Sequence, residues 1–142
     1  MFQVPTKTQY AIRALVHLVH NGSSSVASIA EAERISPKYL EAIISQLKNA
    51  GLVVSDRGRT GGYRLARDAR DILMSEVVRA TEGEVKPVVC IDSTASCVAA
   101  VNCLPRRFWI GLKKAVDGYL QSVSLADIAE PVWVGTKPDT ES

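Results

Sequence analysis

Three cysteines carry the most distinctive chemistry in this chain. Cys90, Cys97 and Cys103 lie within fourteen residues, with the spacing Cys-x6-Cys-x5-Cys, in a segment without apolar periodicity. An odd number of cysteines argues against a simple disulfide framework, and clustered thiols in a reducing compartment are more often metal ligands or redox groups. Thiolates are the ligands that iron–sulfur clusters require, whereas zinc sites tend to use tighter Cys-x2–4-Cys pairs. We therefore expect an iron–sulfur cluster, 2Fe-2S or 4Fe-4S, with bound zinc or thiol oxidation as the alternatives.

A second chemically suggestive group lies between two short β-type runs. The loop from Asp56 to Arg64 carries Arg57, Arg59, Thr60 and three glycines. Arginine suits a narrow, electronegative minor groove, and glycines let the backbone come close to phosphates. An ordinary exposed turn has a similar composition, but a nucleotide-binding loop is not indicated because the Gly-Lys-Ser/Thr ending is missing. We expect Arg57, Arg59, Thr60 and Arg64 to contact DNA.

A third group begins the helix that precedes this loop. Ser36 is a good N-cap and is followed by proline, so Ser36, Lys38, Tyr39 and Glu41 occupy early, exposed positions. The second helix of a helix-turn-helix presents such positions to base edges in the major groove. Lys38 can reach a phosphate or a guanine edge, and Tyr39 a phosphate. Glu41 is repelled by phosphates but can accept from a cytosine amino group; a merely solvated glutamate is the alternative.

Apolar periodicity shows which elements must position these groups. It predicts helices over 6–21, 26–33, 37–49, about 75–81 with Ser75 as N-cap, and 105–122, and strands over 52–54 and 63–65. Two short helices followed by a basic hairpin make a winged helix-turn-helix. The predicted fold is therefore mainly α with a small β-wing: a winged helix-turn-helix plus a long C-terminal dimerisation helix.

The chain divides by function into four parts. We expect a DNA-binding domain over 1–83, a cysteine-bearing cluster loop over 84–104, a dimerisation helix and following segment over 105–129, and a loose tail over 130–142. The helix after Pro105 carries an apolar face formed by Phe108, Leu112, Val116 and Tyr119. A chain this small should not leave that face exposed, so it predicts a two-fold homodimer and a near-palindromic DNA site.

Composition and charge agree with a DNA-binding protein. The 142 residues are 46% hydrophobic, which is enough for a packed core. Residues 1–70 hold ten Lys/Arg and five Asp/Glu, a balance of +5, whereas residues 71–142 hold seven and ten, a balance of −3. No apolar run approaches the ~18–20 residues that span a bilayer, and the N-terminus has no apolar signal core. We expect a cytoplasmic protein with a polyanionic partner and no membrane association.

Longer stretches of sequence resemble the Rrf-type family of bacterial winged-helix transcription regulators, whose members include IscR-, NsrR- and CymR-like proteins. The Gly-Gly-Tyr-Arg-Leu wing is the most specific part of the match, and the resemblance covers nearly everything from Thr6 to Ala129. The matching segments are 7–15, 29–30, 35–41, 47–53, 57–66, 77–83 and 124–128.

The resemblance implies a homodimer that recognises DNA through its third helix and wing. It also implies that members with three clustered cysteines carry an iron–sulfur cluster and that IscR-like members have a glutamate matching Glu41. The fourth cluster ligand departs from both known patterns. Arg106 stands where IscR-like members have a histidine, and Gln9 where one NsrR-like pattern has a carboxylate. Gln9 or Thr8 of the partner subunit, Asp92 or a small molecule remain open as that ligand.

These observations predict a DNA-binding transcription regulator, a repressor, controlled by a cluster on the three cysteines. The alternative is a winged-helix regulator that senses through thiol oxidation or zinc. An enzyme is not expected, because a cysteine nucleophile needs a base and an orienting group and no such motif is present. A protein that kept the fold but lost DNA binding is disfavoured by the arginine-bearing wing. His17 and His20, three residues apart on the first helix, could share a metal, although ordinary neutral histidines are the simpler interpretation.

Overall fold

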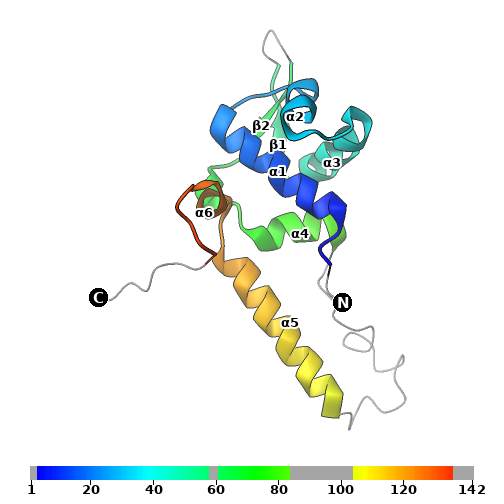
Figure 1. Ribbon diagram of the computed structural model, residues 1–142, viewed down its shortest axis with the longest axis vertical. Helices are drawn as coiled ribbons and strands as arrows, with labels where there is room; N and C mark the ends of the chain where they lie inside the picture. Colours follow the sequence, from blue (N-terminus) through cyan, green and yellow to red (C-terminus); the bar gives the residue numbers. More distant parts are fainter. Residues whose placement is uncertain (1–2, 58–60, 84–103, 136–142) are drawn as a thin grey trace.

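The computed structural model describes residues 3–57, 61–83 and 104–135. Its elements are α1 (Thr6–Asn21), α2 (Val26–Glu33), α3 (Pro37–Asn49), β1 (Val53–Ser55), β2 (Tyr63–Leu65), the 3-10 turn η1 (Ala69–Asp71), α4 (Met74–Glu82), α5 (Leu104–Ser122) and α6 (Leu125–Ala129). Helices α1–α3 and the β-hairpin form one end of the molecule, and α5 extends toward the other end (Figure 1). The predicted fold, a mainly helical chain with a small β-wing, is confirmed.

Local signals explain where the first three helices begin and end. The Ser25 hydroxyl accepts the Ser28 N–H at 3.1 Å and caps α2, the usual role of serine at an N-cap. Ser36 lies at the N-cap of α3, but its side chain makes no capping hydrogen bond, so Pro37 alone marks that start. Gly51 follows α3 with a φ of 77°, a left-handed conformation that glycine adopts without strain.

Three predicted boundaries need correction. Strand β1 begins at Val53 and not at residue 52, because the Leu52 N–H still closes α3 by bonding to the Leu47 carbonyl oxygen. Helix α4 begins at Met74 with Leu73 as its N-cap, because the Glu76 carboxylate accepts the Leu73 N–H at 3.0 Å; Ser75 is not the cap. Helix α5 begins one residue before Pro105.

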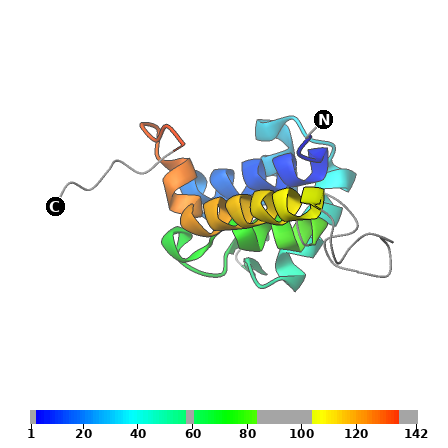
Figure 2. The same ribbon diagram turned by 90° about the horizontal axis from the view of Figure 1, so that it is seen from below.

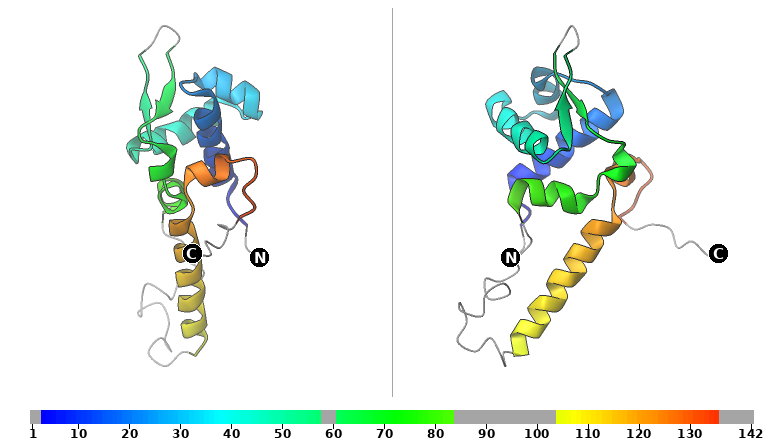
Figure 3. Two further views of the ribbon diagram at one scale, coloured as in Figure 1. Left: turned by 90° about the vertical axis from the view of Figure 1, so that its left-hand side faces the viewer. Right: turned by 180° about the vertical axis from the view of Figure 1, so that it is seen from behind.

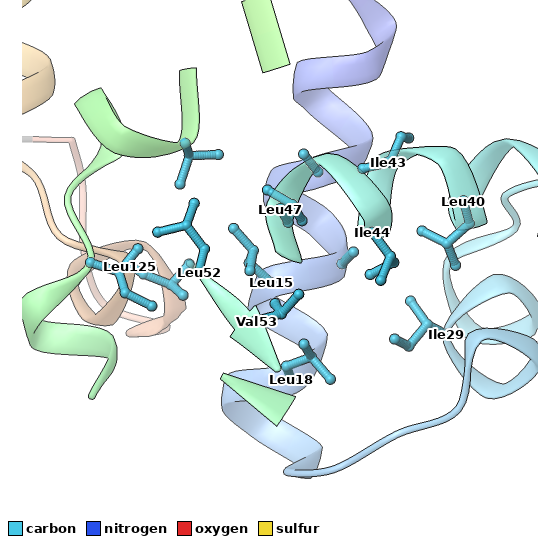
Figure 4. Packing of buried hydrophobic residues seen from close by; sticks show 14 of the residues in the cluster. Leu15, Leu18, Ile29, Leu40, Ile43, Ile44, Leu47, Leu52, Val53 and Leu125 are labelled. Atoms are coloured by element: carbon cyan, nitrogen blue, oxygen red, sulfur yellow. The ribbon is translucent and has the colours of Figure 1, made fainter. Parts of the chain in front are cut away.

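The core fills the space between α1, α3 and the base of the hairpin (Figure 4). Helix α3 contributes Leu40, Ile43, Ile44 and Leu47, which form its buried stripe. Leu15 of α1 and Leu52 close to β1 are completely buried against it.

Strand β2 is bonded on both sides. It pairs with β1 in antiparallel register, with Arg64 opposite Val54. On its other side, the Ser24 N–H donates to the Tyr63 carbonyl oxygen and the Tyr63 N–H donates to the Ser24 carbonyl oxygen, both at 2.9 Å. The wing is therefore attached to the α1–α2 connection as well as to its own hairpin.

The chain returns to the winged domain after α5. The Met74 N–H donates to the Val123 carbonyl oxygen at 2.9 Å, and the Leu125 N–H donates to the Ile72 carbonyl oxygen at 2.8 Å. Residues 72–74 and 123–125 therefore pair around Leu73 and Ser124. Helix α6, which lies in the segment predicted to follow the long helix, adds the completely buried Leu125 to the core. Beyond it, residues 130–135 belong to the part predicted as a tail, and Trp133 there packs against the core cluster.

Helix α5 packs mainly against α4 and leaves much of its surface open. Viewed from the α5 end of the molecule, α5 lies between α1 and α4 in projection (Figure 2). The side views show it pointing away from the winged domain (Figure 3). No helix in the described part of the chain is long and apolar enough to cross a membrane.

Candidate nucleic-acid interface

The early part of α3 presents one exposed face. Ser36, Lys38, Tyr39 and Glu41 are all exposed, whereas Leu40 between them is completely buried. Because burial of Leu40 fixes how the helix is rotated, its neighbours must point to solvent. The structure thus brings together the four α3 residues that the sequence predicts for DNA contact.

The wing presents a second exposed group. On β2, Tyr63 and Leu65 are half-buried against the core, and Arg64 between them points outward, as the alternation of a strand requires. Arg57 is exposed on the other side of the tip, where the Asp56 N–H closes the loop on the Gly62 carbonyl oxygen at 2.8 Å. The two other wing residues predicted for DNA contact, Arg59 and Thr60, lie outside the described residues.

The basic residues of the winged domain divide into two kinds. Some are neutralised within the fold by nearby carboxylates. These pairs are Arg13–Glu33 at 3.3 Å, Arg67–Glu76 at 2.8 Å and Arg70–Asp68 at 3.2 Å. By contrast, Lys38, Arg57 and Arg64 form no ion pair with any described residue. Their charges remain available to a polyanion.

The pKa values of two carboxyls reflect this internal pairing. Hydrogen bonds from the Arg70 side chain and backbone hold the pKa of the exposed Asp68 below its usual value. At Glu76, partial burial acts to raise the pKa, but the Leu73 N–H and the Arg67 guanidinium together lower it below the usual value. Both carboxyls are therefore ionised at neutral pH and keep their arginines occupied.

Gly62 sets the position of the wing. Its φ is 139°, and a Cβ built on it would lie 2.6 Å from the Ser24 carbonyl oxygen, inside van der Waals contact. A residue with a side chain cannot occupy this position while Ser24 and Tyr63 remain paired. Sequence reasoning found Gly62 as part of the loop but missed Ser24, because a single isolated bridge leaves no local pattern.

Most of the predicted cluster ligands lie outside the described residues. These are Cys90, Cys97, Cys103 and Asp92. Of the other ligand candidates, Gln9 is exposed and donates its Nε2 to the Val4 carbonyl oxygen at 2.7 Å.

The two histidines of α1 have separate partners. His17 Nδ1 lies 3.6 Å from a Glu33 carboxylate oxygen, and His20 Nε2 lies 2.9 Å from the Ala129 carbonyl oxygen. Within the described ranges, no three His, Cys, Asp or Glu side chains gather where they could hold a metal ion. These contacts favour structural roles for both histidines.

The four α5 residues predicted for dimerisation lie on the arm that leaves the winged domain. Phe108 is 65% exposed and Tyr119 is 49% exposed, whereas Leu112 and Val116 are half-buried. Phe108 packs edge-on against Trp109, with ring centroids 4.9 Å apart. The Tyr119 hydroxyl donates to the Gly135 carbonyl oxygen at 2.7 Å, so it also ties residue 135 to the arm.

Comparison with known proteins agrees with this architecture. The family model Rrf2, described as an iron-dependent transcriptional regulator, matches residues 4–131. The transcriptional regulator IscR of Photobacterium profundum is 35% identical over 129 residues, which cover 89% of this chain and 74% of that protein.

Two solved structures share the fold. CymR, the global cysteine regulator of B. subtilis, superposes with a TM-score of 0.73 at 34% identity, covering 91% of this chain and 97% of that one. IscR of T. potens superposes with a TM-score of 0.68 at 35% identity, covering 96% and 94%. The family resemblance noted in the sequence is thereby confirmed.

We predict that Gly62→Ala detaches the wing from the α1–α2 connection. The new Cβ must push the Ser24 carbonyl away, which costs about 1–3 kcal/mol of unfolding free energy. Urea unfolding measures the loss, and hydrogen exchange should show the Tyr63 amide losing its protection. Gly61→Asn is the matched control. The φ of Gly61 is 58°, which asparagine tolerates, and a Cβ built there meets no atom within 4 Å outside its chain neighbours. Equal unfolding midpoints for the two variants would contradict the assignment.

Proposed function

The chain belongs to the Rrf2 family of transcriptional regulators, which are DNA-binding proteins and not enzymes, and from this premise we propose how it works. It is a homodimeric repressor that binds a near-palindromic operator through α3 and the wing. An iron–sulfur cluster on Cys90, Cys97 and Cys103 controls that binding. The observation that carries the DNA-binding part is that Lys38 on the exposed face of α3 and Arg64 on the wing form no ion pair with any described residue. Chromosomal DNA as partner makes the cytoplasm its proposed location.

In this proposal, α3 and the wing divide the work of recognition. Lys38 and Tyr39 bind phosphates and set the register of α3 in the major groove. Glu41 accepts from a cytosine amino group and repels sites that offer no donor. Arg57 and Arg64, with Arg59 and Thr60 between them, follow the adjacent minor groove and backbone. Phosphate contacts supply affinity, and Glu41 supplies discrimination.

The proposed dimer forms through the apolar face of α5. Phe108 and Tyr119 expose large rings on a helix that packs mainly against α4, and Leu112 and Val116 lie on the same face. An apolar stripe on an arm that points away from the winged domain suits a second copy of the same helix. A two-fold axis there presents two α3 helices to one duplex.

The proposed cofactor fits the available donor set. Three cysteine thiolates provide soft ligands for an iron–sulfur cluster, and one coordination position is left for a non-cysteine ligand. When bound, the cluster supplies a redox-active, oxygen-sensitive iron centre. The protein's part is to place the three thiols between α4 and α5, since the segment that carries them joins Gly83 to the start of α5. Cluster state can thereby alter how α5 is held relative to the winged domain.

We predict that Arg64→Ala weakens operator binding and reduces the slope of log affinity against log salt by about one unit, because one phosphate contact is lost. Fluorescence anisotropy with a labelled duplex over a range of salt measures both quantities. Arg70→Ala is the matched control, since Arg70 is also exposed but is already paired with Asp68. Glu41→Ala should act in the opposite sense and bind random duplex more tightly. Identical slopes for Arg64→Ala and Arg70→Ala would refute the proposed surface.

We predict that Leu112→Asp halves the molar mass in solution, because a carboxylate buried in an apolar interface has no partner. Light scattering at micromolar protein concentration measures the mass. Lys114→Asp introduces the same carboxylate on an exposed part of α5, on the opposite side of the helix by its 3.6-residue period, and should stay dimeric. A monomeric wild type, or a Leu112→Asp variant that stays dimeric, would count against the dimer.

We predict that protein purified without oxygen contains iron and sulfide and absorbs visible light. Each single change Cys90→Ser, Cys97→Ser or Cys103→Ser should abolish the absorption and the iron, because three thiolates are the minimum donor set here. Metal analysis distinguishes the alternatives. Colourless protein with zinc supports a zinc site, and metal-free protein whose DNA affinity changes on oxidation supports a thiol sensor; either result overturns the cluster.

A further inference from the structure

An aromatic contact joins α1 to the proposed recognition helix. The ring of Tyr10 on α1 meets the ring of Tyr39 in the first turn of α3, with centroids 5.8 Å apart and an interplanar angle of 76°. This edge-to-face arrangement is the geometry that aromatic pairs favour. Tyr39 is 38% exposed, and within the described residues its hydroxyl has no hydrogen-bond partner. The contact therefore holds the ring of Tyr39 and leaves its hydroxyl free.

The Tyr10 ring is itself in contact with Arg13. The Arg13 guanidinium carbon lies 5.5 Å from the centre of the Tyr10 ring, within cation–π range. Arg13 is fixed in turn by Glu33, the last residue of α2: its Nε lies 3.3 Å from the carboxylate, and its Nη2 donates to the Glu33 backbone carbonyl oxygen. A continuous set of contacts thus runs from the end of α2, through α1, to the first turn of α3.

This arrangement restricts a side chain that would otherwise sample several rotamers. An exposed tyrosine on a free helix surface loses rotational freedom when its hydroxyl binds a ligand. A ring already packed against Tyr10 has lost much of that freedom before binding, so its hydroxyl meets a phosphate at smaller entropic cost. The benefit depends on the Tyr10 ring, not on its hydroxyl.

We propose that Tyr10 is a positioning residue for DNA binding: it does not touch DNA but holds the Tyr39 hydroxyl toward a backbone phosphate, with Arg13 and Glu33 holding Tyr10. This inference rests on the proposed function, in which the face of α3 that includes Lys38 binds duplex DNA. It goes further in assigning a role to a residue of α1, outside the helix-turn-helix pair and the wing.

A double-mutant cycle in duplex affinity tests the inference. Tyr39→Phe, which keeps the ring and removes the hydroxyl, should weaken binding about fivefold. Tyr10→Leu should weaken it about two- to fivefold, and no more than Tyr39→Phe does, because it acts only through that hydroxyl. In the double variant, the loss should equal that of Tyr39→Phe alone, because Tyr10 has no hydroxyl left to position. Tyr10→Phe keeps the ring and should bind as the wild type does.

Other outcomes overturn the inference. If the losses from Tyr10→Leu and Tyr39→Phe multiply, or if either change has no effect, Tyr10 does not act through the Tyr39 hydroxyl. If Tyr10→Leu fails to fold, Arg13→Met takes its place in the same cycle and should show a smaller loss that vanishes with Tyr39→Phe. Lys38→Ala distinguishes failure of the proposed DNA surface from failure of the role of Tyr10. If it leaves affinity unchanged, the proposed DNA surface fails; if it weakens binding and the cycle is additive, only the role of Tyr10 fails.

Discussion

The pairing of residues 72–74 with residues 123–125 is the constraint on which the arrangement of this molecule depends. Two backbone hydrogen bonds of 2.8 and 2.9 Å join these segments, and Ile72 and Leu125 there are completely buried. The chain leaves this pairing through α4, which packs against α1 and α3, and returns to it through α5. The cysteine-bearing segment lies between α4 and α5, so it begins at a helix packed on the winged domain and ends at the start of α5.

The cations in the described part of the winged domain divide into those with an ion-pair partner and those without one. Carboxylates neutralise several arginines of the winged domain, as Glu76 does for Arg67 at the start of α4. Lys38 and Arg64 have no such partner in the described part of the chain, although both lie in the same domain. Exposed ion pairs contribute little stability, so omitting them at these positions costs the fold almost nothing. What remains is a surface whose charge is available to phosphates.

Sequence reasoning succeeded where local signals decide the structure. The bounds of α1, α2 and α3 and the exposed early positions of α3 follow from apolar period and residue type, and the structure has both. It failed where a distant partner decides. Ser24 meets the wing through a single bridge, which leaves no local pattern. Helix α6 was missed for another reason: it is only five residues long, although Ser124 and Asp127 form a local capping box at its start. The α4 cap went to Leu73 because the Glu76 side chain reaches back to it, which a search for serine N-caps overlooks.

The first turns of α1 connect the two halves of the molecule through a buried hydroxyl pair. Thr8 and Thr81 are 1% and 5% exposed, and their hydroxyl oxygens lie 2.8 Å apart. Thr81 also donates to the Val77 carbonyl oxygen at 3.1 Å, so Thr8 must be the donor in the pair and both groups are satisfied. Separating α4 from α1 would leave a buried hydroxyl without a partner, at a cost of about 1–3 kcal/mol. Thr81 precedes Gly83, where the cysteine-bearing segment departs, and Thr8 lies in the same turn as Tyr10, which contacts α3. One turn of α1 therefore contacts both the end of α4 and the first turn of α3.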